Sequence, residues 1–202
     1  MTTVRAFLAI PLPPPLQRAI AKLQGELAGS LPGIRWARPE TVHLTLHFFG
    51  DTSTVDLEKI RVSMLSVSLR ERPFQVDLLG IGAFPDHRRP RVVWLGLLPE
   101  EPLRALQHAC EDELVRSGIP AEARAFAPHL TIGRFRERAP DLTALLAAQP
   151  QHRLGRLPVE QLVLYESRLL PGGAQHLPLF TVPLRRNDQL NDRTSKEGTE
   201  HG

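Results

Sequence analysis

The sequence predicts an α+β protein built as one globular unit of 202 residues. Strand-like runs rich in β-branched and aromatic residues alternate with amphipathic helical stretches, and some of the strands follow one another as hairpins, which argues against a parallel βαβ array. One strand motif occurs twice, at residues 43–48 and 129–135, which predicts two related strands that share one cleft. A hydrophobic content of 42% is enough for one core, shared by two closely packed lobes.

The first half of the chain alternates strand and helix signals. Residues 4–10 form a strand-like run that ends at a proline cluster, and Pro15 then suits the first turn of a helix that continues to Gly29. A second strand is expected over residues 42–49, and a second amphipathic helix over residues 56–70.

The second half begins with a hairpin signal. Residues 74–83 and 91–98 read as strands, and the loop between them, 84–90, has the proline, charge and polarity of an exposed turn. A third helix is expected from Pro102 to Gly118. The remaining expected elements are strands over residues 127–135, 159–167 and 177–184 and a short alanine-rich helix over residues 141–148.

The end of the chain differs from the rest in composition. Residues 187–202 are polar and carry few apolar side chains, so we expect a disordered tail after a single domain that spans residues 1–186. The single cysteine, Cys110, excludes an intramolecular disulfide and a cysteine-rich zinc site. The apolar run at residues 7–10 is too short to span a membrane and meets prolines at once, so we expect a cytoplasmic protein.

The charge of the chain is basic and carried mainly by arginine. The formal net charge is +3 and the sequence pI is about 9.6, while lysine occurs only at Lys22, Lys59 and Lys196. Guanidinium groups suit bidentate contact with phosphate, which favours a phosphate-bearing partner. Arginine-rich composition can equally reflect codon bias, so charge by itself does not decide between partners.

The repeated motif contains the candidate catalytic residues. His-Leu-Thr-Leu-His-Phe begins at His43, and His-Leu-Thr-Ile-Gly-Arg-Phe begins at His129. Because successive strand side chains point to opposite faces, each histidine shares a face with the threonine two positions later, Thr45 or Thr131. By the same alternation His47 shares the face of His43. Three residues of the first copy should point into the core: Leu44, Leu46 and Phe48.

This set of groups suits a phosphodiester. Displacement at phosphorus needs a base that takes a proton from water and an acid that gives one to the departing oxygen. Two imidazoles that titrate near neutral pH can fill both roles without a metal. Threonine hydroxyls can donate hydrogen bonds to the non-bridging oxygens as negative charge develops there.

The chain resembles the bacterial RNA 2′,3′-cyclic phosphodiesterases of the two-histidine phosphoesterase superfamily, first described as 2′-5′ RNA ligases. The resemblance covers residues 5–184. It is carried by these segments: Arg35-Trp36, Pro39-Glu40, His-Leu-Thr-Leu-His-Phe-Phe-Gly at 43–50, Pro-Arg-Val-Val-Trp at 90–94, and Pro-His-Leu-Thr-Ile-Gly-Arg-Phe at 128–135. Two positions depart from the family, since His47 and His176 stand where other residues are common.

The resemblance implies a bilobal α+β fold, with antiparallel sheets related by pseudo-two-fold symmetry around a central cleft and helices outside. By position it makes His43 the proton donor and His129 the proton acceptor. The implied reaction opens the 2′,3′-cyclic phosphate at an RNA 3′ end or oligonucleotide to leave a 2′-phosphate, without a metal or other cofactor. We expect a monomer with no membrane partner, and weak 2′-5′ ligation as the reverse reaction.

Arg134 is a candidate phosphate ligand with a geometric condition. By strict alternation it lies on the opposite face from His129, so it reaches the cleft only if Gly133 introduces a bulge. Otherwise it is an exposed arginine at a strand end. His47 could line the rim of the cleft, but a solvent-exposed strand histidine is the preferred interpretation, and we leave it out of the site.

Other residues have weaker functional interpretations. The four-residue spacing of His43 and His47 would suit zinc only on a helix, and no His-Glu-x-x-His pattern exists, so no metal site is expected. Trp36 and Trp94 could stack a base, although core packing is the commoner fate of tryptophan. The basic loop His87-Arg88-Arg89 could meet an RNA backbone or be a solvated turn.

Two other functions stay open from the sequence. A non-catalytic RNA-binding module could use the same basic cleft, although binding needs no acid and base pair. A related phosphodiesterase could act on small cyclic nucleotides or 2′-5′ oligoadenylates, because the loops that shape the pocket cannot be placed from sequence.

Overall fold

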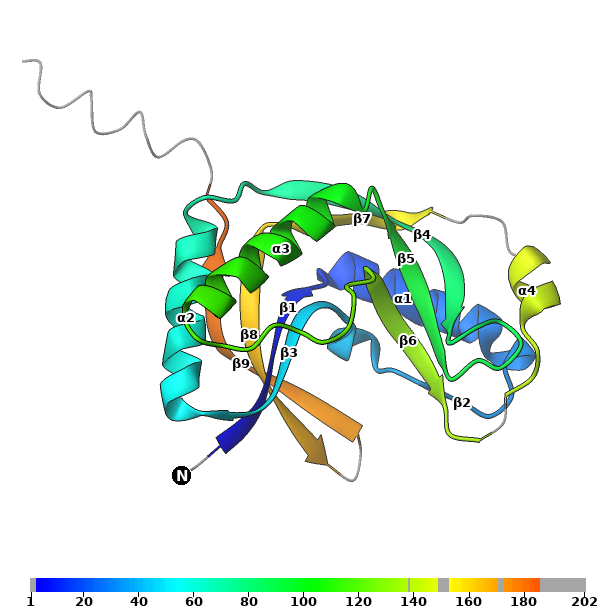
Figure 1. Ribbon diagram of the computed structural model, residues 1–202. Coiled ribbons are helices and arrows are strands. Elements are labelled where there is room, and N and C mark those ends of the chain that lie inside the picture. The colour runs from blue at the N-terminus through cyan, green and yellow to red at the C-terminus, as the bar shows by residue number, and fades with distance from the viewer. Residues whose placement is uncertain (1–2, 138, 149–152, 171–172, 186–202) are drawn as a thin grey trace, which may run out of the picture.

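A nine-stranded antiparallel sheet runs through the whole molecule (Figure 1). The computed structural model describes residues 3–137, 139–148, 153–170 and 173–185. The strands are β1 (Thr3–Pro11), β2 (Ile34–Trp36), β3 (His43–Ser53), β4 (Phe74–Phe84), β5 (Val92–Leu98), β6 (His129–Phe135), β7 (Arg153–Val159), β8 (Gln161–Leu170) and β9 (Gly173–Pro183). The helices are α1 (Pro14–Leu27), α2 (Thr54–Ser68), α3 (Glu101–Arg116) and α4 (Thr143–Ala148), with short 3₁₀ turns η1 (Ala28–Ser30) and η2 (Pro39–Thr41).

The strand order shows two related halves of the sheet. It is β7-β4-β5-β6-β3-β1-β8-β9, and β2 pairs with β6 off this path. The central strands β6 and β3 are each preceded in the chain by a helix and a partner strand, β5 with α3 and β1 with α1. The predicted α+β fold with two antiparallel halves is therefore confirmed, and the halves are joined edge to edge into one sheet.

Two strands of the sheet are absent from the sequence prediction. β2 is only three residues long, too short for a periodic pattern. β7 contains Gly155 and Pro158, which weaken a strand signal, but it lies at the end of the strand order, where proline is tolerated. The strand expected over residues 159–167 is thus divided, because Val159 ends β7 and β8 begins at Gln161.

Helices α1 and α3 pack across the two halves of the sheet. Helix α1, which connects β1 to β3 in one half, packs against β7 of the other half through the face that contains Leu16. Helix α3, which connects β5 to β6, packs against α2 and β3. Each connecting helix therefore contacts the opposite half of the sheet. The predicted helices all form, and α2 begins where Ser53 accepts a hydrogen bond of 3.1 Å from the backbone N–H of Asp56.

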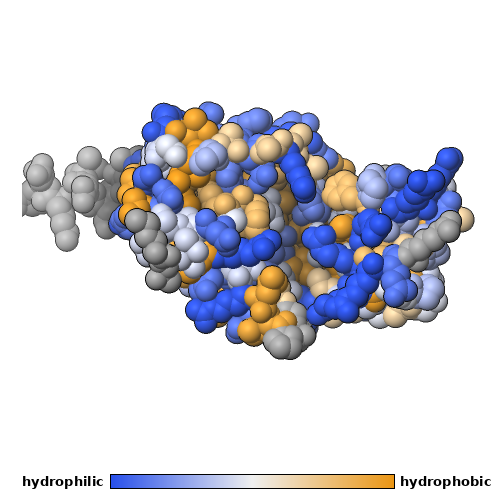
Figure 2. Space-filling model, turned by 60° about the horizontal axis from the view of Figure 1, so that its bottom comes forward, coloured by the Kyte–Doolittle hydropathy of each residue, from blue (hydrophilic) through white to orange (hydrophobic). Residues whose placement is uncertain are grey.

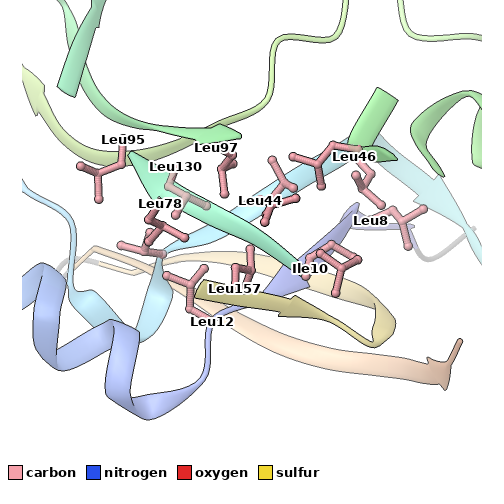
Figure 3. Packing of buried hydrophobic residues seen from close by; sticks show 14 of the residues in the cluster. Leu8, Ile10, Leu12, Leu44, Leu46, Leu78, Leu95, Leu97, Leu130 and Leu157 are labelled. Atoms are coloured by element: carbon pink, nitrogen blue, oxygen red, sulfur yellow. The ribbon is translucent and has the colours of Figure 1, made fainter. Parts of the chain in front are cut away.

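Among the described residues, one hydrophobic core lies beneath both halves. Leu44 of β3 and Leu130 of β6 lie opposite one another in the sheet and are 1% and 0% exposed. Figure 3 shows them in one cluster with Leu95 of β5 and Leu157 of β7. Burying a leucine side chain stabilises a fold by about 1.5–3 kcal/mol, so this central pair holds the two halves in a fixed relation.

Within the described ranges, no helix is both long enough and apolar enough to cross a membrane. The tail predicted over residues 187–202 lies outside the residues that the structure describes.

Candidate active site

A pocket of about 580 Å³ lies where the two halves of the sheet meet. Its walls come from β1, β2, β3, β6 and the β8–β9 hairpin. All five residues predicted for the site line it: His43, Thr45, His129, Thr131 and Arg134. Figure 2 shows the face at the bottom of Figure 1, on which hydrophilic side chains predominate. The structure thus brings the five side chains together, while their catalytic roles stay predictions.

The strand register explains why the motifs meet. Strands β3 and β6 are antiparallel and pair at Leu44 and Leu130, which are the second residues of the two motifs. This register puts His43 level with Thr131 and Thr45 level with His129 on the pocket face. One histidine and one threonine from each strand therefore border the same space, related by a local two-fold axis near the leucine pair.

Both motif strands contain a β-bulge at the fourth motif position. Leu46 in β3 and Ile132 in β6 are skipped in the pairing with the neighbouring strand. The flanking pairs are Leu8 with His47 and Ala9 with Thr45 on one side, and Val93 with Gly133 and Trp94 with Thr131 on the other. A bulge adds one unpaired residue, so every side chain beyond it changes face.

The bulge brings Arg134 into the pocket. Strict alternation would place it on the core side, but the extra residue at Ile132 turns Gly133 inward and Arg134 outward. The condition for Arg134 to reach the cleft is therefore met. Gly133 is also required for space, because a Cβ there would lie 2.6 Å from Cδ1 of Ile34 in the short strand β2.

The matching bulge in β3 overturns two expectations. His47, expected on the exposed face, is buried at 4% exposure and stacks on Phe49 with ring centroids 4.5 Å apart. Burial lowers the pKa of His47, against the opposing effect of Glu122 and Glu111. Phe48, expected in the core, is instead 42% exposed and lines the pocket, with the Arg5 guanidinium 4.9 Å from its ring centroid. Both errors have one cause, because alternation holds only as far as the bulge.

The two motif histidines are held in the same tautomer. Nδ1 of His43 lies 2.8 Å from the carbonyl oxygen of Thr41, and Nδ1 of His129 lies 2.7 Å from that of Ala127. A carbonyl can only accept, so Nδ1 carries the proton in both rings. Each neutral imidazole then has its lone pair on Nε2, the nitrogen left for a ligand.

Burial makes both imidazoles weaker bases than a free histidine side chain. It lowers the pKa of His43 to about 4, with smaller contributions from His176 and His129, while the hydrogen bond to Thr41 acts in the opposite direction. Burial also lowers the pKa of His129, helped by Arg134 and opposed by the carbonyl of Ala127. Both rings are therefore neutral near pH 7.

The rings around the histidines differ between the halves. His43 stacks on Phe7 of β1, with centroids 4.7 Å apart and planes 28° apart. His129 meets the edge of Phe84 of β4 at 5.0 Å and 88°. Aromatic contacts on β1 and β4 thus restrict the orientation of both imidazoles.

An arginine pair next to Thr131 makes the pocket electropositive. Arg35 of β2 lies directly opposite Arg134 of β6, and both line the pocket. Neither guanidinium is within ion-pair distance of a carboxylate in the described part of the chain. Like charges across a strand pair are unfavourable unless an anion lies between them. Arg35 is not among the predicted site residues, and its only sequence signal is the Arg-Trp pair before the first motif.

Some of the remaining candidate residues line the pocket and others do not. Trp36 lines the pocket, whereas Trp94 packs against Phe84 behind His129 and does not. The loop His87-Arg88-Arg89 lines a different surface hollow, and Asp86 accepts hydrogen bonds from the backbone of the two arginines. Across the described ranges, no three His, Cys, Asp or Glu side chains gather as a metal site would require. His176 of β9 lines the pocket beside His43; from the sequence it is only a departure from the family pattern with no assigned role.

A comparison with protein families finds the same repeat. The model of the LigT-like phosphoesterases matches twice, at residues 10–94 and 95–175, and each match contains one of the two motifs.

Similar proteins extend over nearly the whole chain. A protein of Methanothermobacter thermautotrophicus named RNA 2′,3′-cyclic phosphodiesterase is 34% identical and covers 88% of this chain and 95% of its own length. One of the same name from Methanocaldococcus jannaschii is 31% identical, with 89% and 98% covered. The crystal structure of Escherichia coli LigT complexed with 3′-AMP is 27% identical, with a TM-score of 0.73, and covers 91% of this chain and 99% of LigT. With its fold, its doubled motif and these matches, the chain belongs to the LigT-like phosphoesterase family.

Proposed function

We propose that this protein hydrolyses terminal RNA 2′,3′-cyclic phosphates to 2′-phosphates by acid and base catalysis with two histidines. The observation that carries the proposal is the pair of imidazoles that line one pocket, each fixed by a carbonyl so that Nε2 is free, and each accompanied by a threonine. A site that only bound phosphate would need no such pair of proton carriers.

Relatives support the choice of substrate. The archaeal proteins at 31% and 34% identity carry the name RNA 2′,3′-cyclic phosphodiesterase. Escherichia coli LigT, at 25% to 27% identity, has been crystallised with phosphate and with 3′-AMP. A nucleotide with a phosphate on its ribose is the kind of ligand that a pocket of about 580 Å³ with four arginines would hold.

The proposed step uses each group once. Nε2 of His129 takes a proton from water as its oxygen bonds to phosphorus, and the bond from phosphorus to O3′ breaks as Nε2–H of His43 protonates O3′. Thr45 and Thr131 donate hydrogen bonds to the non-bridging oxygens, and Arg134 stabilises their negative charge. With the 5′-hydroxyl of a second RNA in place of water, the same groups would give weak 2′-5′ ligation.

The proton donor acquires its proton when the substrate binds. With a pKa of about 4, His43 is almost wholly unprotonated on Nε2 at neutral pH. A phosphate anion beside it favours the imidazolium and raises the pKa. His129 stays neutral and acts as the base. The guanidinium of Arg134 lowers the pKa of His129 and so opposes its protonation.

A substrate panel tests the proposal. Purified protein in excess EDTA should hydrolyse an oligoribonucleotide ending in a 2′,3′-cyclic phosphate and leave a linear 3′-phosphate end intact. Faster turnover of 2′-5′ oligoadenylate or of free cyclic nucleotides would assign the site to a different substrate. Loss of all turnover in EDTA, with recovery on adding a divalent ion, would overturn the metal-independent mechanism.

A further inference from the structure

A third histidine in the pocket has no task in the proposed step. His176 lies on β9, opposite Ser167 of β8, and its ring is nearly perpendicular to that of His43, with centroids 5.1 Å apart. It meets the ring of Phe7 edge-on at 4.9 Å and lines the same pocket. His43, Phe7 and His176 therefore form one aromatic corner of the site.

The environment of His176 differs from that of the two motif histidines in one respect. Nδ1 of His176 is buried and has no hydrogen-bond partner in the described part of the chain. A buried N–H without an acceptor is costly, so the neutral ring is more stable with its proton on Nε2. His43 and His129 present an Nε2 lone pair, whereas His176 has an Nε2–H available as a donor.

The ring should stay neutral at the pH of the reaction. Burial lowers the pKa of His176, and the guanidinium of Arg38 lowers it further. Among the described residues, the titratable rings in contact with His176 are those of His43 and Tyr165, neither of which is an anion near neutral pH. A neutral donor suits an oxygen without formal charge, such as the bridging O3′ or the 3′-hydroxyl that it becomes in the product, better than a charged non-bridging phosphate oxygen, which the arginines and threonines can bind.

The position of His176 indicates which part of the ligand it meets. It borders His43, whereas the ring neighbours of His129 are Phe84 and Trp94. In an in-line displacement, water enters on the side of the base and the ribose departs on the side of the acid. The corner around His43 is thus the ribose side of the pocket.

We propose that His176 is a nucleoside-binding residue whose Nε2–H donates a hydrogen bond to the ribose at its 3′-oxygen. This rests on the proposed function, because the ribose side is defined by the role given to His43. Leu169 and Leu170, which line the pocket from the same hairpin and are 74% and 49% exposed, provide an apolar wall for the rest of the nucleoside.

Binding measurements without turnover test the contact. Cytidine 2′-monophosphate and inorganic phosphate are titrated into wild type, His176→Phe, His176→Gln and His176→Asn by calorimetry. Phenylalanine keeps a ring against Phe7 but has no donor, glutamine can place an amide N–H near the position of Nε2, and asparagine places it near Nδ1.

The expected result is a loss of nucleotide affinity of roughly 3- to 10-fold in His176→Phe and His176→Asn, with recovery in His176→Gln. Affinity for inorganic phosphate should be unchanged, and equal melting temperatures would show that the variants are folded. Unchanged nucleotide binding in His176→Phe, or an equal loss for inorganic phosphate, would overturn the ribose contact and leave the proposed function intact. Failure of the wild type to bind the nucleotide at all would overturn both.

Discussion

The motif strands β3 and β6 have a β-bulge at the same motif position and differ in the side chains beyond it. Both present a histidine and a threonine to the pocket, and both bulge at the fourth motif position. Beyond the bulge, β3 has His47 buried against Phe49 and Phe48 at the pocket, whereas β6 has Gly133 paired with β2 and Arg134 at the pocket.

The difference shows how one repeated unit forms an asymmetric site. The residues before the bulge supply a histidine and a threonine from each strand, and an in-line displacement at phosphorus uses one such set on each side. The residues beyond the bulge give one wall an aromatic ring, Phe48, with the guanidinium of Arg5 over it, and the other wall a pair of arginines, Arg134 opposite Arg35. In the proposed function, this difference orients a nucleotide whose phosphate lies at the arginine pair.

The largest expected effect tests the part that the strands share. His43→Ala and His129→Ala should each lower turnover of a cyclic-phosphate oligonucleotide by about 10²- to 10⁴-fold, because each removes one positioned acid or base. The double variant should be little slower than either single variant, because the two act in the same step. Steady-state kinetics give the rates, and thermal melts show whether the fold is kept. Independent, multiplicative losses would contradict a shared step.

The next effect tests the residues beyond the bulge. Arg134→Ala should weaken inorganic phosphate binding by about 10- to 100-fold, the range for a lost hydrogen bond to a charged group. Phe48→Ala should leave phosphate binding unchanged and weaken only nucleotide binding. Calorimetry on the two variants measures both. An equal loss of phosphate affinity in both variants would remove the distinction between the walls.

A third prediction concerns why β6 needs glycine where β3 has histidine. Gly133→Ala should reduce the free energy of unfolding by about 1–3 kcal/mol, because its Cβ would overlap Ile34. Urea denaturation measures the loss. Gly25→Ala, where a Cβ in helix α1 would meet nothing within 4 Å, is the control and should stabilise slightly. In an Ile34→Ala background, Gly133→Ala should lower the free energy of unfolding by less. An equal loss in both backgrounds would show that the added Cβ does not clash with Ile34.

The smallest effect concerns the pH dependence of anion binding. The pKa of His43 is about 4, and the proposed function requires it to rise when an anion binds, so binding should take up protons between these two values. Sulfate affinity should therefore increase as the pH falls from 7.5 toward 5, by at most about tenfold per unit for one proton. Sulfate keeps its charge over this range, so the protein supplies the slope. A slope that is the same in His43→Asn would assign the proton to another group.

Strict alternation predicts the faces of the motif residues before the bulge correctly and those beyond it wrongly. The first four residues of each motif follow simple alternation, which correctly placed the side chains of His43 and Thr45 opposite those of Leu44 and Leu46. The bulge at Leu46 has no glycine or proline to mark it, so His47 and Phe48 were placed on the wrong faces. In β6, Gly133 directly after the bulge is a sequence signal that a bulge can occur there.

The elements missed from the sequence depend on tertiary context. Strand β2 pairs with β6 where Gly133 leaves room for the side chain of Ile34, and β7 tolerates Gly155 and Pro158 because it is an edge strand. His176 reaches the site only through the register of the β8–β9 hairpin, where it pairs with Ser167. Such pairings between strands are not encoded in local periodicity.

Product analysis tests the central claim most directly, because the two halves are proposed to act on opposite sides of the phosphorus. An oligoribonucleotide with a terminal 2′,3′-cyclic phosphate is incubated with the wild-type protein in EDTA, and the product is identified by ³¹P NMR. With His43 protonating O3′ and His129 activating water, the only product should be the 2′-phosphomonoester. A 3′-phosphomonoester would mean that O2′ departs, and it would contradict the placement of the ribose and the roles given to the two strands.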